Sequence, residues 1–463
     1  MPAKTSTLKT PKTNVSSASR LQQKVKFNPK LVLALSILLI ATLGFIYIFF
    51  SKASALKEYV YYAGYTTANN KNSVEVWDPT TKSMVKSIDL PAYPSQNGCT
   101  TNRPYWYDHV LELRSANRAF VIPSGCGGLQ SESLLVPSID TTTHTYTGKS
   151  LALTTKSGML DVVSNEIKKQ YYVHDYNGGT VTVVDGLTNA VVKTLNVNDV
   201  AGVFAEGIVV SGDGQWLVIL YGNDERGSGA DPTAYKNVVI YDTATYTNKR
   251  SLKANASGFA FKNRSHTHNA VSVAGSQDIY AVGRVDDTNG NVTKLQLIKI
   301  TIQPTSIFAA VGQDLPTTNL QFDDVASIQP GYIHIMSMKG YDPNVNKAYP
   351  LLLKYNVSTK QFETAPGANI DTIQSGEMFA SQDPSVAIIT TYNTLSTYNF
   401  STGAVNSYIP RQGTPVLGSV IPTTPSPTAT ATVSSSPSTS TTPTASTSTT
   451  APVPSTGGGN TTN

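Results

Sequence analysis

Apolar and polar residues alternate along short stretches of this chain, and the alternation recurs in pairs of stretches. The clearest example is residues 178–195, where Val181 and Val183 alternate with Thr182 before a polar turn that begins at Asp185. Alternation with a period of two predicts strands that bury one face, and the turn between two such strands predicts a hairpin. Asp and Thr suit the turn because their side chains hydrogen-bond nearby backbone amides.

Copies of this hairpin follow one another along the chain. Two more are clear, at residues 73–81 and 237–245, and degenerate copies centre on residues 139–140, 299–300, 355–356 and 398–399. The period is about 53 residues, a length typical of propeller and solenoid repeats. Another pair of strands precedes each hairpin, for example residues 206–211 and 215–220. Four strands in each of seven units predict an all-β, seven-bladed β-propeller.

The two ends of the repeat region predict how the ring closes. The first unit begins at residues 59–64, which match the second strand of the other units, so this unit lacks an innermost strand. The spare apolar segment at residues 416–421, after the seventh unit, is expected to supply that strand. Without it the first blade would expose an open strand edge.

Several units resemble the YVTN-type surface propeller repeats. Residues 172–195 contain Tyr-Val-His-Asp, Val-Thr-Val-Val-Asp and Val-Val-Lys-Thr-Leu in that order, with Asp175 where the family usually has Asn. Residues 211–214, Ser-Gly-Asp-Gly, resemble the family's Ser-Pro-Asp-Gly turn. The resemblance covers roughly residues 59–421, and it is closest in the first, third and fourth units. It implies the propeller fold and exposure at a cell surface, and it implies no chemistry.

The N-terminal region predicts a membrane anchor. Residues 31–50 are almost entirely Leu, Ile, Ala and Phe, and a helix of about 20 residues spans about 30 Å, the thickness of the bilayer's hydrocarbon core. Residues 1–30 carry seven basic residues and no acid, which predicts a cytoplasmic N-terminus and a propeller outside the membrane. Cleavage near residues 53–55, Ala-Ser-Ala, is the alternative, but the long apolar run favours a retained transmembrane helix.

Composition sets the remaining boundaries. Residues 422–463 are almost entirely Ser, Thr, Pro, Ala and Gly without a charged residue, so they are expected to form a disordered tail. The chain thus divides into a basic cytoplasmic segment (1–30), a transmembrane helix (31–50), the propeller (51–421) and the tail (422–463). The net charge is +5, and subtracting the seven basic residues before residue 31 leaves −2 for the rest. Nucleic-acid binding therefore has no support.

The chain has two cysteines, in connections expected on one face of the ring. Cys99 lies between the first and second blades, and Cys126 lies between the second and third strands of the second blade. An extracytoplasmic setting permits oxidation, so a disulfide between them is expected; two separate thiols are the alternative.

Polar residues recur where the innermost strand of each blade is expected to begin. A seven-fold ring would bring them toward the central axis, at the mouth of the channel. They are Asp108, His109, Ser157, Glu206, His266, His268, Asp323, Asp324 and Glu377. Carboxylates and imidazoles bind divalent cations, and such a position suits a polar ligand. The sequence therefore predicts a ligand site there, with a divalent cation as one candidate ligand, against the alternative that these loops are polar because they are solvated.

These features together favour a membrane-anchored, extracytoplasmic propeller that acts as a binding or adhesion module at the cell surface. Its expected partners are the membrane, through one N-terminal helix, and a surface protein or glycan. An enzyme of the lactonase or quinoprotein-like type that uses the channel mouth is the second interpretation, and a structural envelope component is the third. No Gly-x-Ser-x-Gly or zincin motif occurs, and the chain has only three Trp residues, so the sequence favours binding over catalysis.

Overall fold

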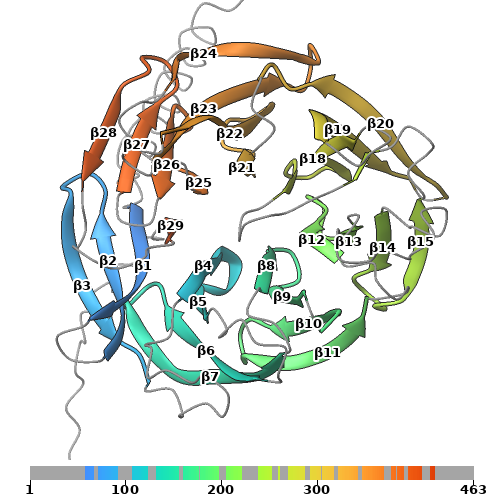
Figure 1. The fold of residues 1–463 in the computed structure, drawn as a ribbon. Helices are drawn as coiled ribbons and strands as arrows, with labels where there is room; N and C mark the ends of the chain where they lie inside the picture. Colours follow the sequence, from blue (N-terminus) through green and yellow to red (C-terminus); the bar gives the residue numbers. More distant parts are fainter. Residues whose placement is uncertain are drawn as a thin grey trace, which may run out of the picture. The chain divides into compact units, whose positions relative to one another are not determined.

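Seven β-sheets stand around a central axis in the computed structural model of the chain, which confirms the all-β, seven-bladed propeller (Figure 1). All described residues belong to the compact unit Met1–Thr424, which is separate from the unit Pro425–Asn463. The structure describes residues 58–66, 71–91, 107–123, 132–155, 160–176, 178–197, 205–221, 238–252, 259–260, 269–286, 292–303, 305–317, 322–342, 347–369, 377–381, 383–390, 395–408 and 418–422. No helix within these ranges is long and apolar enough to cross a membrane, and the predicted span at residues 31–50 lies outside them.

Each of the first four blades is a four-stranded antiparallel sheet. From the axis outward, blade 1 contains β29 (Gly418–Pro422), β1 (Glu58–Thr66), β2 (Lys71–Asp78) and β3 (Ser83–Asp89). Blade 2 contains β4 (Tyr107–Leu113), β5 (Arg118–Pro123), β6 (Glu132–Asp140) and β7 (Thr145–Thr155), with the 3₁₀ helix Arg114–Ala116 after β4. Blade 3 contains β8 (Leu160–Asn165), β9 (Gln170–Asp175), β10 (Thr180–Asp185) and β11 (Ala190–Asn196). Blade 4 contains β12 (Ala205–Val210), β13 (Trp216–Tyr221), β14 (Val238–Asp242) and β15 (Asn248–Leu252).

The last three blades follow the same plan, with one variation. In blade 5, β16 (Phe259–Ala260) and β17 (Ala270–Ser272) share the innermost place beside β18 (Asp278–Asp286), which is followed by β19 (Val292–Ile302) and β20 (Ile307–Asp314). Blade 6 contains β21 (Phe322–Ala326), β22 (Tyr332–Asp342), β23 (Lys347–Asn356) and β24 (Gln361–Asn369). Blade 7 contains β25 (Glu377–Ala380), β26 (Val386–Thr390), β27 (Leu395–Asn399) and β28 (Val405–Tyr408).

The spare segment at the end of the repeats closes the ring, as predicted. Strand β29 pairs antiparallel with β1, from Glu58 opposite Pro422 to Tyr62 opposite Gly418. Blade 1 is therefore built from both ends of the domain, and β1 is hydrogen-bonded on both sides. The closing strand runs one residue beyond the predicted boundary at residue 421.

The apolar core lies between the blades. The described residues form seven hydrophobic clusters, and each cluster contains side chains of two neighbouring blades. The cluster that joins the last blade to the first packs Ile388 and Leu395 of blade 7 against Val60, Tyr62 and Trp77 of blade 1. Each blade thus buries both faces against its neighbours, and this burial is the main stabilising term in the ring.

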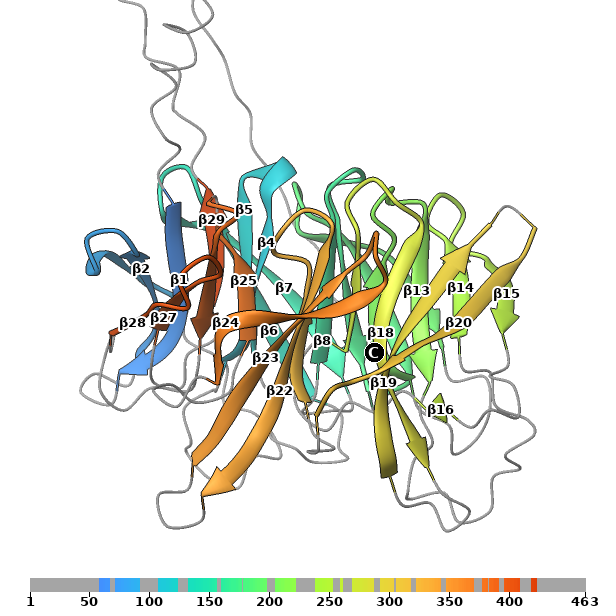
Figure 2. The ribbon, with the colours of Figure 1, turned by 90° about the horizontal axis from the view of Figure 1, so that it is seen from above.

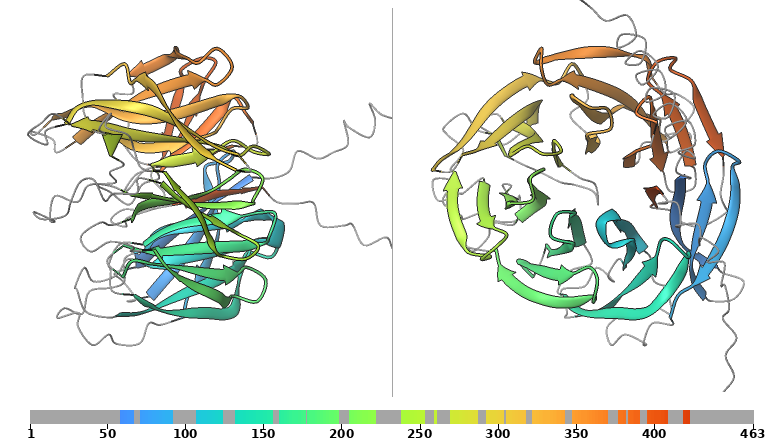
Figure 3. Two further views of the ribbon diagram at one scale, coloured as in Figure 1. Left: turned by 90° about the vertical axis from the view of Figure 1, so that its right-hand side faces the viewer. Right: turned by 180° about the vertical axis from the view of Figure 1, so that it is seen from behind.

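The ring has two different faces. We call the end at which the innermost strands begin the start face, and the opposite end the turn face. The central hairpins of blades 5 and 6, β18–β19 and β22–β23, reach further at the start face than their neighbours do (Figure 2). Strand β22 has 11 residues, whereas β13, the second strand of blade 4, has 6. Figure 3 shows the same ring from the side and from behind.

Six of the seven blades share one turn on the turn face. An Asp or Asn at the end of the third strand accepts hydrogen bonds of 2.7–3.1 Å from the amides two and three residues later. These acceptors are Asp78, Asp140, Asp185, Asp242, Asn356 and Asn399. The residue four positions after each acceptor has a positive φ of 52–70°. The prediction that polar side chains hold these corners is confirmed.

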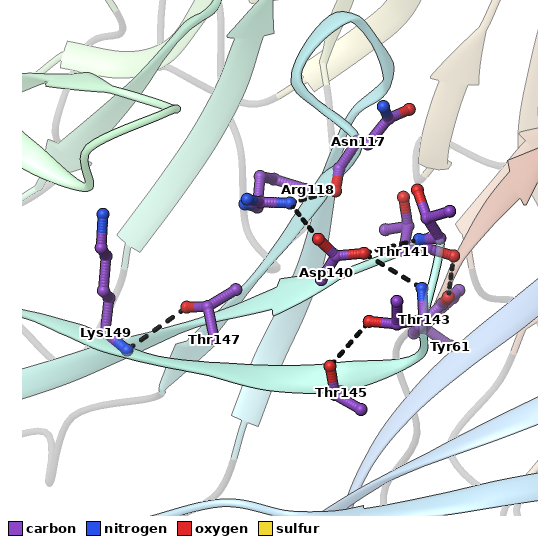
Figure 4. A network of polar contacts seen from close by, with 10 residues as sticks. Tyr61, Asn117, Arg118, Asp140, Thr141, Thr143, Thr145, Thr147 and Lys149 are labelled. Carbon is purple, nitrogen blue, oxygen red and sulfur yellow. Dashed lines mark hydrogen bonds and ion pairs between the residues drawn. The ribbon is translucent and has the colours of Figure 1, made fainter. Parts of the chain in front are cut away.

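In blade 2 this turn also contacts the neighbouring blade (Figure 4). The Asp140 carboxylate accepts from the Arg118 guanidinium at 2.6 Å, and the Tyr61 hydroxyl of blade 1 donates to the Thr141 carbonyl at 3.4 Å. Blade 5 departs from the pattern. Its third strand continues to Ile302, and the backbones of Gln303 and Ser306 close the turn, because no Asp or Asn stands at the end of that strand.

Removal of β29 should open the ring. A chain that ends after Pro422 loses none of the described strands, so we expect its thermal midpoint to match that of the full chain. A chain that ends before residue 414 leaves the inner edge of β1 unpaired, and we expect it to lose several kcal/mol of stability or to aggregate. Thermal unfolding of the two truncated chains compares them directly. Equal midpoints would contradict closure by β29.

Candidate functional site at the start face

Three acidic residues occupy the same place at the beginning of the innermost strands. The β-ladder shifts register between Tyr107 and His109 in blade 2, between Ala205 and Gly207 in blade 4, and between Phe322 and Asp324 in blade 6. The extra residues at these bulges are Asp108, Glu206 and Asp323. Bulges turn a side chain away from the regular alternation and are frequent beside functional sites. Alternate blades therefore present an acid from an irregular point of the backbone.

The next position along the strand is also equivalent from blade to blade. In blades 2, 3, 4, 6 and 7 this position lies opposite the fifth residue of the second strand. Those fifth residues are Ile122, His174, Leu220, Met336 and Thr390, respectively. The residues that occupy it are His109, Asp161, Gly207, Asp324 and Glu377. Three of the predicted site residues thus share one register position, and Asp161 joins them.

Carboxylates at this second position join neighbouring blades. The Asp161 carboxylate accepts from the Ile208 amide of blade 4 at 3.0 Å, and the Asp324 carboxylate accepts from the Met378 amide of blade 7 at 2.7 Å. An innermost strand pairs on one side only, so its other amides need an acceptor from outside the ladder. Asp324 is 2% exposed. It lies at the predicted place, and its carboxylate links blades 6 and 7.

Blade 4 has glycine at this position, and a side chain there would meet the Asn269 side chain of blade 5. A Cβ on Gly207 would lie 2.4 Å from Asn269 Oδ1 of blade 5. Asn269 is 2% exposed, and its Nδ2 has no hydrogen-bond partner. A buried amide nitrogen without a partner is uncommon in proteins and is costly. The Asn269 amide therefore lies next to the Glu206 bulge with a donor to spare.

Blade 3 holds a buried histidine opposite Asp161, the residue that contacts blade 4. His174 pairs with Asp161 in the ladder, is 1% exposed, and has no hydrogen-bond partner at Nε2. Burial lowers the pKa of His174 from 6.5 to about 4, and the charge of Asp161 offsets only part of this shift. The imidazole is therefore neutral near pH 7. His174 and Asn269 thus each carry a buried nitrogen without a hydrogen-bond partner, in the two blades that flank blade 4.

The predicted site residues therefore divide into three groups. Asp108, Glu206 and Asp323 lie at the bulges, and His109, Asp324 and Glu377 lie at the following register position. Ser157, His266 and His268 lie outside the described residues, as do both cysteines of the expected disulfide, Cys99 and Cys126. Among the described side chains, no group of three His, Cys, Asp or Glu residues could hold a metal ion.

Sequence reasoning missed Asp161, His174 and Asn269. Asp161 could have been found by aligning the innermost strands, because Asp161-Val162 and Asp324-Val325 then coincide. No local signal marks His174 or Asn269, since each owes its environment to a neighbouring blade.

No protein-family model matches the chain, and neither does any curated protein. Solved structures resemble it at low identity. A protein from Lactobacillus plantarum is 11% identical, with a TM-score of 0.49 over 79% of this chain and 99% of that one. The periplasmic gluconolactonase PpgL of Pseudomonas aeruginosa is 12% identical, with a TM-score of 0.47 over 79% and 98%. Apo AztD from Citrobacter koseri is 11% identical, with a TM-score of 0.44 over 79% and 98%.

The carboxylate links between blades should contribute measurably to stability. Asp161→Ala and Asp324→Ala each leave a backbone amide unsatisfied, so we expect each to lower the free energy of unfolding by about 1–3 kcal/mol. Asp161→Asn and Asp324→Asn keep an acceptor oxygen and should lose less. Thermal unfolding of the four variants measures this difference. An Ala variant as stable as the wild type would show that the link contributes nothing.

Buried histidines should make the fold sensitive to acid. Burial, with a smaller effect of the Lys354 charge, lowers the pKa of His334 from 6.5 to about 3. Below pH 6.5 the unfolded chain binds a proton at His174 and at His334, while the folded chain does not until its lower pKa is reached. Each histidine should therefore reduce stability by about 1.4 kcal/mol per pH unit as the pH falls from about 6 toward its folded pKa.

The repeat itself supplies the control variants for this test. Leu220 and Tyr172 occupy the positions of His174 and His334 in other blades, so His174→Leu and His334→Tyr are the matched substitutions. Thermal midpoints of the double variant and the wild type should diverge between about pH 7 and about pH 5, with the wild type losing more. Parallel loss in both proteins would rule out these histidines as the source of acid sensitivity.

Proposed function

We propose that the chain is a membrane-anchored binding module of the cell surface that binds a polar ligand at the start face of the propeller. One observation carries the proposal: Asp108, Glu206 and Asp323 stand at equivalent bulges of alternate blades. Carboxylates accept hydrogen bonds and attract cations, so the ligand class is a cation or a compound rich in hydroxyl groups. A surface glycan belongs to the second kind.

The electrostatics of the three acids favour an occupied site. The three innermost strands begin around one axis, so we expect their carboxylates to repel one another and a cation or a set of hydroxyl donors to relieve that repulsion. The unsatisfied nitrogens of His174 in blade 3 and Asn269 in blade 5 belong to the two blades that flank blade 4, and they add a neutral imidazole and an amide donor. Such a combination of charged and neutral polar groups is typical of sites that orient a polar ligand.

The path of the chain supports display of this face at the cell surface. The apolar residues 31–50 and the basic residues before them favour an anchor with the propeller outside. The chain enters the ring at Glu58 and leaves it at Pro422, which are paired at the turn face. The anchor therefore approaches the ring from the turn face, and the start face is at the other end. Membership of the YVTN-type repeat family is part of the same proposal.

Ligand binding should appear as thermal stabilisation. Ca²⁺, Zn²⁺, Mn²⁺ and Cu²⁺, followed by neutral and acidic oligosaccharides, are screened against the full chain in detergent. A ligand at about a hundred times its dissociation constant should stabilise the fold by about 2.7 kcal/mol. The triple variant Asp108→Asn, Glu206→Gln, Asp323→Asn should lose this stabilisation.

A matched acid on the turn face provides the control. Glu363→Gln removes a carboxylate from the outer strand of blade 6 and should leave the ligand-induced shift unchanged. If no ligand shifts the wild type, or the triple variant responds as the wild type does, the start face is not a binding site. The structural envelope role would then be the better account.

A further inference from the structure

The exposed apolar side chains of the described residues belong to two blades. The described residues include six large apolar side chains that are exposed, and each lies in a turn of the turn face or within three residues after one. They are Met84 and Val85 in blade 1, and Ile167, Leu187, Val191 and Val192 in blade 3. None of the described residues at the start face is of this kind. Four of the six belong to blade 3, and a local group of this kind, unlike single exposed residues, indicates a contact surface.

The most exposed members project from two turns that are bonded together. Ile167, which is 64% exposed, lies in the turn between β8 and β9, and Leu187, which is 47% exposed, lies in the turn between β10 and β11. The Gly186 amide donates to the Lys169 carbonyl at 2.8 Å, which joins the two turns. Blade 3 therefore presents two apolar tips on a fixed support.

Lysines surround these apolar side chains. Lys82 and Lys86 flank Met84 and Val85, Lys168 and Lys169 follow Ile167, and Lys193 follows Val192. The same stretches hold three acids against these five lysines: Asp78 and Asp185 accept amides of their own turns, and Glu166 accepts hydrogen bonds from the Arg114 and Ser115 amides. Apolar tips surrounded by lysines are characteristic of surfaces that lie in the interface of an anionic bilayer.

The proposed anchor holds this same face close to the membrane. Glu58 begins β1 at the turn face, where its carboxylate accepts from the Ser381 hydroxyl at 2.8 Å. Seven residues, 51–57, separate Glu58 from the end of the apolar segment at residue 50. Seven extended residues reach at most about 25 Å, so the turn face cannot move far from the bilayer.

We propose that the turn face docks on the surface of an anionic lipid bilayer, with Ile167 and Leu187 of blade 3 between the lipid headgroups. This inference rests on the proposed membrane anchor. It fixes the orientation of the domain: the lysines contact lipid phosphates, and the start face points away from the membrane. A second copy of the chain could instead pair with the outer strands β3 and β11, and the experiment below distinguishes this pairing from lipid contact.

Tryptophan quenching by brominated lipid tests the docking. The full chain is reconstituted, one copy per nanodisc, in phosphatidylcholine brominated on its acyl chains, with and without phosphatidylglycerol. Leu187→Trp reports on the turn face, and Thr293→Trp, an exposed position in β19 of the projecting hairpin, reports on the start face. Each emission is measured as the difference from the wild type. We expect loss of the Leu187→Trp emission, strongest with phosphatidylglycerol, and no loss for Thr293→Trp.

Charge variants test the role of the lysines in the same assay. Lys168→Glu with Lys169→Glu, added to Leu187→Trp, should reduce the quenching, whereas Lys168→Arg with Lys169→Arg should preserve it. If Leu187→Trp is not quenched in single-copy nanodiscs, the docking is overturned. This is the result expected if the apolar side chains serve pairing between two copies of the chain. Stronger quenching of Thr293→Trp would reverse the orientation.

Alkaline carbonate extraction of the same chain from membranes separates the two proposals. A chain that stays in the membrane but shows no quenching at Leu187→Trp retains its anchor and lacks the docking. A chain that is released contradicts the anchor and the docking together.

Discussion

Every innermost strand of the ring pairs on one side only, and the rest of the structure depends on how its other edge is satisfied. In blades 3 and 6 a carboxylate reaches forward to the next blade: Asp161 accepts the Ile208 amide, and Asp324 accepts the Met378 amide. In blade 1 the second strand, β1, would have an unpaired inner edge without β29. The closing strand pairs with that edge and joins the two ends of the domain.

Closure in this form makes the two faces of the ring unequal. Pairing of Glu58 with Pro422 brings both ends of the domain to the turn face. The start face, with its acidic bulges and the buried nitrogens of His174 and Asn269, carries neither end. Among the described residues, the exposed apolar side chains lie in the turns of the face that holds the two ends or just after them. The proposed ligand site and the proposed lipid contact therefore follow from one feature of the topology.

Local pattern predicted the fold well and the site only in part. Strand alternation and the Asp and Asn turns are properties of neighbouring residues, so the hairpins and the spare closing strand could be read directly from the sequence. Blade 5 was harder, since no turn acceptor marks the end of β19. The chemistry of Asp324, His174 and Asn269 comes from contacts between blades, which a single repeat does not contain. The bulges at Asp108, Glu206 and Asp323 are likewise invisible until strands are paired.

Amide hydrogen exchange of β1 is the most direct measurement of this account. If β29 pairs with β1, every amide of the segment from Val60 to Tyr62 lies in a three-stranded ladder. Mass spectrometry of the full chain should then find β1 exchanging as slowly as β13, which is paired on both sides in blade 4. Exchange as fast as that of the outer strand β3, which has one open edge, would contradict the closure and the separation of faces that follows from it.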